Sequence, residues 1–119
     1  YDPNLELLLL ENDKAVGHLL LLPTLLIHET SGYPCLKIAS LLGEKEENKH
    51  LLLSAGKERA KNTNVLAIFA TGKQDFYTRE GFFGLKELSL YSLDGIPEEY
   101  AYVFPLTKDL PSGGVLLQG

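Results

Sequence analysis

Two neighbouring stretches in the second half of the chain constrain its fold most. Val65–Ala70 reads VLAIFA, and an unbroken apolar run of this kind predicts a strand buried on both faces of a sheet. Asp75–Glu80 follows and predicts a short helix, with Phe76 and Tyr77 as apolar anchors. Gly81 then stops this helix, because the residue after a helix often takes a left-handed conformation that favours glycine. A helix that follows a buried strand predicts a mixed sheet covered by helices.

The first part of the chain predicts an antiparallel hairpin. Asn4–Glu11 and Ala15–Leu22 are short apolar runs joined by a polar turn at Asn12–Lys14, and Pro23 ends the second run. A pair of short helices is the competing reading, because leucine is a good helix former. We prefer the hairpin, since neither run is long enough for a stable helix and Gly17 weakens one of them.

The remaining elements follow from the same patterns. Before Val65 we expect a loop over Glu29–Pro34, a strand over Cys35–Leu42, a charged loop over Gly43–Lys49 and a helix over Leu51–Lys61. After Gly81 we expect a strand over Leu85–Tyr91, a turn at Asp94–Gly95 and a last strand over Tyr100–Leu106. The length of 119 residues predicts one domain over residues 1–119.

Composition argues against several classes of function. The net charge of -5 lacks the basic footprint of a nucleic-acid-binding protein. One cysteine excludes an internal disulfide framework and a multi-cysteine zinc site, and it fits a reducing, cytoplasmic setting. Three scattered histidines give no metal-ligand spacing, and no apolar run is long enough to cross a bilayer, so neither a metal nor a membrane is expected. The chain has no methionine, so we expect it to be part of a longer protein.

Several motifs resemble the GNAT N-acetyltransferase family when they are taken together. FYTREGF, residues 76–82, is similar to the FYxxxGF signature near the end of the family domain. The strings AVGHLLL, CLKIASLL, LLLSAGKERAK and VLAIFA stand at matching distances before it, and GIPEEYAYVFPL resembles the end of one bacterial branch. The resemblance implies an α+β, GNAT-like domain whose mixed, mostly antiparallel central sheet is flanked by helices. It also implies that the family's first strand and first two helices are missing.

The resemblance implies an enzyme. A GNAT protein moves an acetyl group from acetyl-CoA, its co-substrate, to a primary amine of a small molecule or peptide by direct attack on the thioester. Tyr77 matches the tyrosine that protonates the departing thiolate, and a phenol with a pKa of about 10 carries its proton at neutral pH. Plain aromatic packing explains Tyr77 equally well. A homodimer is the default expectation for its assembly.

The residues that the resemblance assigns to acetyl-CoA are Leu41, Leu42, Gly43, Asn48, Lys49, His50 and Phe76. The first three would act through backbone N–H groups freed by a bulge in their strand, where an ordinary strand end is the alternative. The next three would lie at a helix N-terminus and cap it or meet a phosphate, where a solvated cap is the alternative. A general base is not apparent, and Glu44, His28 and Glu29 also read as exposed loop charges.

The chain departs from the family at its most diagnostic motif. The family has Q/R-x-x-G-x-G/A before its long helix, because glycines let backbone N–H groups cradle the pyrophosphate. Here that position reads GEKEENKH, with Gly43 alone, and three glutamates would oppose a phosphate. The alternative function is therefore a catalytically degenerate GNAT-fold module for binding or regulation. An unrelated α+β interaction domain explains the composition but not the ordered motifs.

Overall fold

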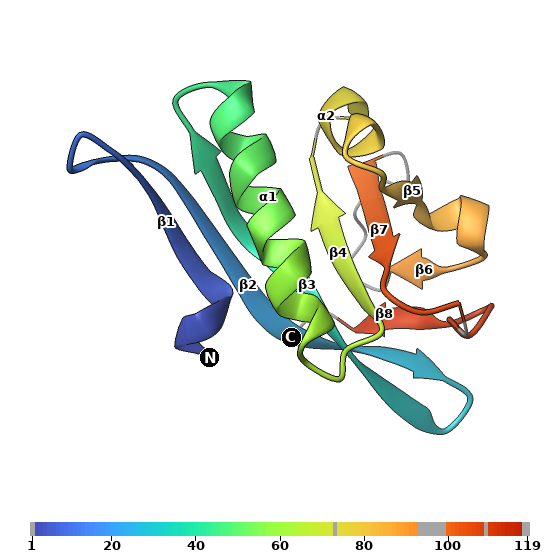
Figure 1. Ribbon diagram of the computed structural model, residues 1–119. Helices are drawn as coiled ribbons and strands as arrows, with labels where there is room; N and C mark the ends of the chain where they lie inside the picture. Colours follow the sequence, from blue (N-terminus) through green and yellow to red (C-terminus); the bar gives the residue numbers. More distant parts are fainter. Residues whose placement is uncertain (1, 73, 93–99, 109, 118–119) are drawn as a thin grey trace.

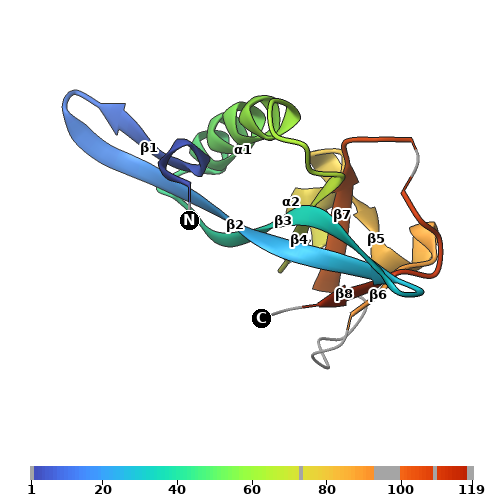
Figure 2. The ribbon, with the colours of Figure 1, turned by 90° about the horizontal axis from the view of Figure 1, so that it is seen from below.

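The computed structural model describes residues 2–72, 74–92, 100–108 and 110–117, which form one mixed sheet with two α-helices on one face (Figures 1 and 2). In chain order, with η for 3-10 helices, the elements are η1 Pro3–Leu5, β1 Glu6–Glu11, β2 Lys14–His28, β3 Ser31–Gly43, α1 Glu46–Lys61, β4 Ala67–Thr71, α2 Gln74–Arg79, β5 Phe83–Gly84, η2 Leu85–Leu88, β6 Tyr91–Ser92, β7 Ala101–Pro105 and β8 Val115–Leu117. Among the described residues the strand order is β5-β7-β4-β3-β2-β8-β6, and β1 pairs with β2. The pairs β3–β4 and β6–β8 are parallel, and the others are antiparallel.

Helices α1 and α2 cover one core of the sheet. Leu53 of α1 and Leu19 of β2 are fully buried in this core, and Tyr77 of α2 belongs to it. The helix approaches the sheet closely, because a Cβ on Gly56 would lie 2.6 Å from Cδ2 of Leu19 and one on Gly17 would lie 2.7 Å from Cδ1 of Leu52. Helix α1 is therefore held against β2 at a distance that leaves no room for larger side chains.

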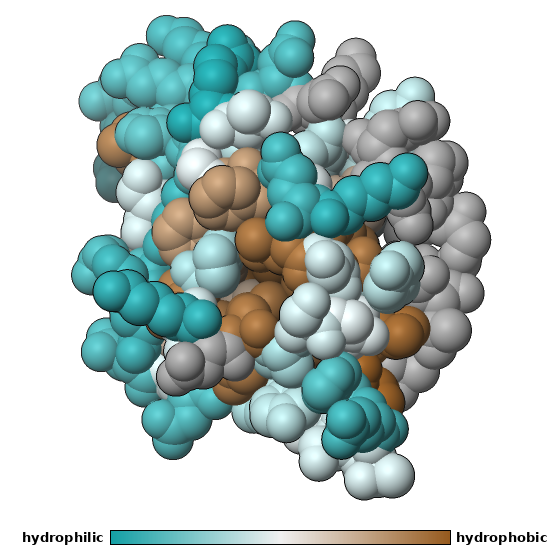
Figure 3. Space-filling view, turned by 90° about the vertical axis from the view of Figure 1, so that its right-hand side faces the viewer, coloured by the Kyte–Doolittle hydropathy of each residue, from teal (hydrophilic) through white to brown (hydrophobic). Residues whose placement is uncertain are grey.

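The opposite face of the sheet encloses a second core. Its buried members are Leu26, Cys35, Ala67, Phe69, Leu85, Leu90, Ala101, Val103 and Leu116. The short η2 segment links β5, at one end of the strand order, to β6 at the other end, so the sheet curls around these side chains. Figure 3 shows the β5 side of the molecule, where an apolar patch lies between hydrophilic residues above and below it. Phe83 of β5 is 45% exposed.

The predicted hairpin is confirmed, but its second strand does not end at Pro23. Strand β2 continues to His28, and the expected loop over Glu29–Pro34 is only a two-residue turn at Glu29 and Thr30. Strand β1 pairs with β2 up to Leu20, and β8 pairs with it again from Leu25. Pro23 lies between these pairings, where the outer side of β2 requires no N–H donor, and a strand tolerates proline there.

Two other boundaries differ from the sequence prediction. Helix α1 begins at Glu46, inside the expected charged loop, because acidic residues in the first turn and the Asn48 side chain favour a helix start there. The expected strand over Leu85–Tyr91 is wrong, since Leu85–Leu88 is a 3-10 turn that ends at Ser89 with φ 56°.

The other predicted elements are found close to where the sequence placed them. The two central strands, the α2 helix and the strand over Tyr100–Leu106 correspond to β3, β4, α2 and β7, and the turn at Asp94–Gly95 lies outside the described residues. No helix in the described ranges combines the length and apolar character needed to cross a membrane.

Candidate active site

The central feature of the site is the point where β3 and β4 part. Their parallel pairing is limited to Leu36 with Ile68 and Lys37 with Phe69, although β3 continues to Gly43. Beyond Lys37, β3 stays paired with β2 on its other side, so its β4-facing backbone has no partner strand among the described residues. Backbone N–H and C=O groups of a sheet are therefore available at this edge.

A β-bulge lies at the point of separation. Leu21 pairs with Ile38 and Leu20 pairs with Ser40, which leaves Ala39 as the extra residue of β3. A bulge bends the strand that carries it and increases its twist, which explains why β3 turns away from β4 here. The family resemblance placed this irregularity at Leu41–Gly43. The structure instead pairs those three residues regularly with Leu19, His18 and Gly17 of β2, so the bulge comes earlier.

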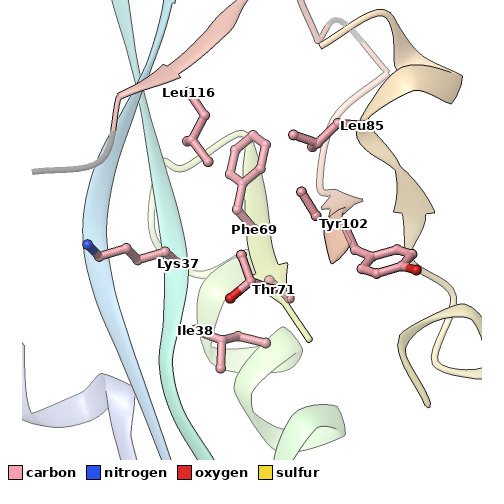
Figure 4. Close-up of a pocket in the computed structure, with 9 residues that line it drawn as sticks. Lys37, Ile38, Phe69, Thr71, Leu85, Tyr102 and Leu116 are labelled. Carbon is pink, nitrogen blue, oxygen red and sulfur yellow. The ribbon is translucent and has the colours of Figure 1, made fainter. Parts of the chain in front are cut away.

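A small cavity of about 40 Å³ lies where the strands part (Figure 4). It is lined by Lys37, Ile38, Phe69, Ala70, Thr71, Leu85, Ala101, Tyr102 and Leu116. In Figure 4, Ile38 of β3 and Thr71 of β4 lie close together across the gap, while the Lys37 amine points away from it. The lining is mostly apolar, and a space of this size holds about one water molecule, so it marks the narrow end of the gap between the strands.

Tyr77 lies beside the end of β4. Its ring is 5.3 Å from the Phe76 ring, 5.2 Å from Phe82 and 5.8 Å from Tyr102, with which it stacks. A Cβ on Gly72, the residue that follows β4, would be 3.2 Å from Cε2 of Tyr77. The ring is therefore fixed by aromatic packing at the end of the strand that borders the gap.

The hydroxyl of Tyr77 has different surroundings from its packed ring. The side chain is 7% exposed, and no hydrogen bond is formed by its hydroxyl within the described part of the chain. No fully buried side-chain oxygen or nitrogen there lacks a partner, so the Tyr77 oxygen must reach solvent. Burial raises the pKa of Tyr77 above its usual value. The result is a fixed, protonated phenol whose oxygen is accessible.

The N-terminus of α1 lies next to α2 (Figure 1). Arg79 forms an ion pair with Glu46, and Nδ1 of His50 lies 2.7 Å from Oε1 of Glu80. The Lys49 ammonium is 6.0 Å from the centre of the Phe76 ring. The structure therefore brings the predicted residues Lys49, His50 and Phe76 together between the two helices.

A second lysine also joins the helices. Lys57 donates a hydrogen bond to the backbone carbonyl of Glu80, and its ammonium lies 4.1 Å from the centre of the Phe104 ring. Burial lowers the pKa of Lys57, while the nearby Glu80 charge opposes that shift. This contact fixes α2 relative to the middle of α1.

The candidate bases lie in different places. Glu44 follows β3 near α1, whereas His28 and Glu29 lie at the β2–β3 turn, at the opposite end of β3 (Figure 1). Neither of those two residues is near α2. Within the described ranges no three His, Cys, Asp or Glu residues are grouped to hold a metal ion.

Sequence reasoning missed the bulge at Ala39, because a bulge has no signature in a single sequence. It also missed the Arg79–Glu46 pair, which joins residues far apart in the chain. A helix prediction that included the Glu46–Glu47 pair would have brought Glu46 to the first turn of α1.

Solved structures of N-acetyltransferases share this architecture. YhbS from Escherichia coli, a GNAT family N-acetyltransferase in complex with CoA, matches 89% of this chain and 61% of its own with a TM-score of 0.76 and 16% identity. A GNAT family acetyltransferase from Brucella melitensis in complex with acetyl-CoA matches 96% of this chain and 65% of its own, with a TM-score of 0.70 and 14% identity. A mutant of the toxin AtaT, bound to the C-terminus of the antitoxin AtaR, matches with a TM-score of 0.56 and 14% identity.

The chain therefore has the GNAT fold, an α+β arrangement with a mixed, mostly antiparallel sheet, as the motifs predicted. It spans less than two thirds of the length of these solved structures. No protein-family model matches the chain, and no curated protein matches it.

Proposed function

We propose that this protein transfers an acetyl group from acetyl-CoA to a primary amine. The observation that carries the proposal is the separation of β3 from β4 at the Ala39 bulge, with Tyr77 fixed at the end of β4. A thioester has a carbonyl and a thiol leaving group, and this site supplies free backbone groups beside an accessible acid. Two solved structures of the same fold hold CoA or acetyl-CoA, which supports the choice of donor.

The proposed reaction is a direct attack. The neutral amine attacks the thioester carbonyl, the new C–N bond forms, and the C–S bond breaks. Backbone N–H groups on the free edge of β3 would donate to the carbonyl oxygen as its negative charge develops. The departing thiolate takes a proton from the Tyr77 hydroxyl, the amine nitrogen loses a proton to water, and Tyr77 is reprotonated from solvent. The products are an amide and free CoA.

Two properties of the site suit this reaction. The Tyr77 phenol carries its proton at neutral pH and can act as an acid, and burial, which raises its pKa, keeps it protonated. Much of the rate can come from holding the amine against the thioester, which does not require a strong base. No carboxylate lines the cavity among the residues that the structure describes.

A second candidate function is a module that binds without catalysis. It is favoured by the short connection between β3 and α1, which consists of Glu44 and Lys45. Thermal unfolding with acetyl-CoA, followed by assay of thiol release with a panel of amines, separates the two functions. A ligand at a hundred times its dissociation constant stabilises the folded state by about 2.7 kcal/mol. Stabilisation with turnover supports the enzyme, stabilisation without turnover supports the module, and no stabilisation contradicts the enzyme.

A further inference from the structure

The two residues that connect β3 to α1 use their backbone N–H groups within the protein. The Glu44 amide donates to the Val16 carbonyl, and the Lys45 amide donates to Oδ1 of Asn48 at 2.8 Å. The Asn48 and Lys49 amides both donate to the Lys45 carbonyl. A helix start normally leaves its first amides free for an anion. Here the Glu44 and Lys45 amides are occupied, so an anion at this helix start would meet the amides of Glu46 and Glu47, whose side chains are acidic.

The space beside the connection is also filled. A Cβ built on Gly43 would lie 3.0 Å from Cγ of Lys49, 3.1 Å from Cβ of Asn48 and 3.1 Å from the Lys45 carbonyl oxygen. The backbone of Gly43 is therefore crowded by the chain that follows it. A phosphate group, which is larger than a methyl group, has no room to approach this glycine from that side.

The charge at this helix start is unfavourable for a phosphate. Residues 43–50 contain three glutamates and two lysines. Arg79, from α2, is already paired with Glu46, and the Lys49 ammonium lies near the Phe76 ring. Glu11 of β1 also lines a groove beside the helix start, together with Glu47 and Lys45. The first turn of α1 therefore carries the Glu46 and Glu47 carboxylates, which repel a pyrophosphate.

We propose that this protein recognises its donor through the pantetheine thioester and not through the nucleotide. This inference rests on the proposed function, because it concerns the donor of the same reaction. The open edge of β3 accepts an extended pantetheine arm by backbone hydrogen bonds, while the start of α1 gives no binding energy to the diphosphate. The substrate class is acyl-pantetheine thioesters, of which acetyl-CoA is one member.

The test compares two donors on the same enzyme. We expect kcat/KM for acetyl-CoA and for acetyl-pantetheine to differ by no more than about threefold, since repulsion offsets any gain from the nucleotide. Preference for acetyl-CoA by more than about thirtyfold overturns the inference and leaves the proposed function intact. If neither donor reacts with any amine or stabilises the protein, both the inference and the proposed function are wrong.

A charge variant provides the matched control. Glu11→Gln with Glu47→Gln removes two carboxylates beside the helix start, and we expect kcat/KM for acetyl-CoA to rise about fivefold with no change for acetyl-pantetheine. Glu58→Gln with Glu87→Gln makes the same charge change at exposed sites elsewhere and should alter neither donor. The relevant quantity is the ratio of kcat/KM for acetyl-CoA to kcat/KM for acetyl-pantetheine. If both double variants change this ratio equally, or if neither changes it, the local repulsion is contradicted.

Ionic strength gives an independent readout. Salt screens exposed charges, so it weakens binding of a phosphate held by cations and relieves repulsion by carboxylates. We expect the KM for acetyl-CoA to stay constant or to fall as salt is raised, and the KM for acetyl-pantetheine to stay constant. A KM for acetyl-CoA that rises several-fold with salt would show attraction at the nucleotide and overturn the inference.

Discussion

Tyr77→Phe removes one oxygen atom from the site and should separate stability from activity. The phenylalanine ring keeps the contacts with Phe76, Phe82 and Tyr102, whose centres lie 5.2 to 5.8 Å from the Tyr77 ring. The Tyr77 hydroxyl has no hydrogen bond within the described residues, so none is lost. We therefore expect the free energy of unfolding to change by less than about 0.5 kcal/mol.

Activity should respond very differently to the same change. If Tyr77 donates the proton to the thiolate, its loss lowers kcat by about a hundredfold to ten-thousandfold. Tyr77→Ala serves as the contrast, because it deletes the packed ring and should lower the free energy of unfolding by about 3–5 kcal/mol. Urea unfolding and thiol release measured on the same samples give both quantities.

Two results would refute this reasoning. A stability loss above about 1 kcal/mol in Tyr77→Phe would mean that the hydroxyl has a structural partner. An unchanged kcat in a protein that does transfer acetyl groups would mean that another group protonates the thiolate. In either case Tyr77 would be an aromatic packing residue, as its three ring contacts alone would allow.

Three further predictions concern packing and ionisation. Gly72→Ala should lower the free energy of unfolding by about 1–3 kcal/mol and reduce kcat, because Gly72 has φ 147° and faces the Tyr77 ring. Equal urea midpoints for the variant and the unchanged protein would contradict this. Gly56→Ala gains helix propensity but places a Cβ 2.6 Å from the fully buried Leu19, so we expect a net loss of about 1–3 kcal/mol in urea unfolding and not a gain. Burial raises the pKa of Cys35 to about 11 from 9.0, so the folded thiol should resist iodoacetamide at pH 8. The free energy of unfolding that the protonated thiol contributes should decline as pH rises from 9.0 toward 11. Rapid alkylation of the folded protein would contradict the burial.

The elements that the sequence predicted correctly are those whose signal is local. VLAIFA is apolar throughout because β4 is covered on both faces, and its residues Ala67–Ala70 are all buried. The hairpin follows from two apolar runs and a turn whose residues Asn12 and Asp13 adopt positive φ. Helix α2 follows from its aromatic anchors and from Gly81, which has φ 88°.

The features that the sequence did not predict depend on partners far along the chain. Pro23 is accepted in β2 because neither β1 nor β8 pairs with that position on the outer side of the strand. Leu85 and Leu90 look like part of a strand, but they are buried because η2 closes the curled sheet. Strand β8 exists through its pairing with β2, and the bulge at Ala39 depends on how β3 meets β2.

The gap between β3 and β4 can be tested most directly by following backbone amides during addition of acetyl-pantetheine. Nuclear magnetic resonance of the ¹⁵N-labelled protein should show the largest shifts, and slower hydrogen exchange, at residues 38–40 of β3 and residues 70–71 of β4. The amides of the β1–β2 turn should not change. Shifts confined to other surfaces, or full protection without the thioester of those amides at residues 38–40 that face β4, would contradict the claim that these strands part to hold it.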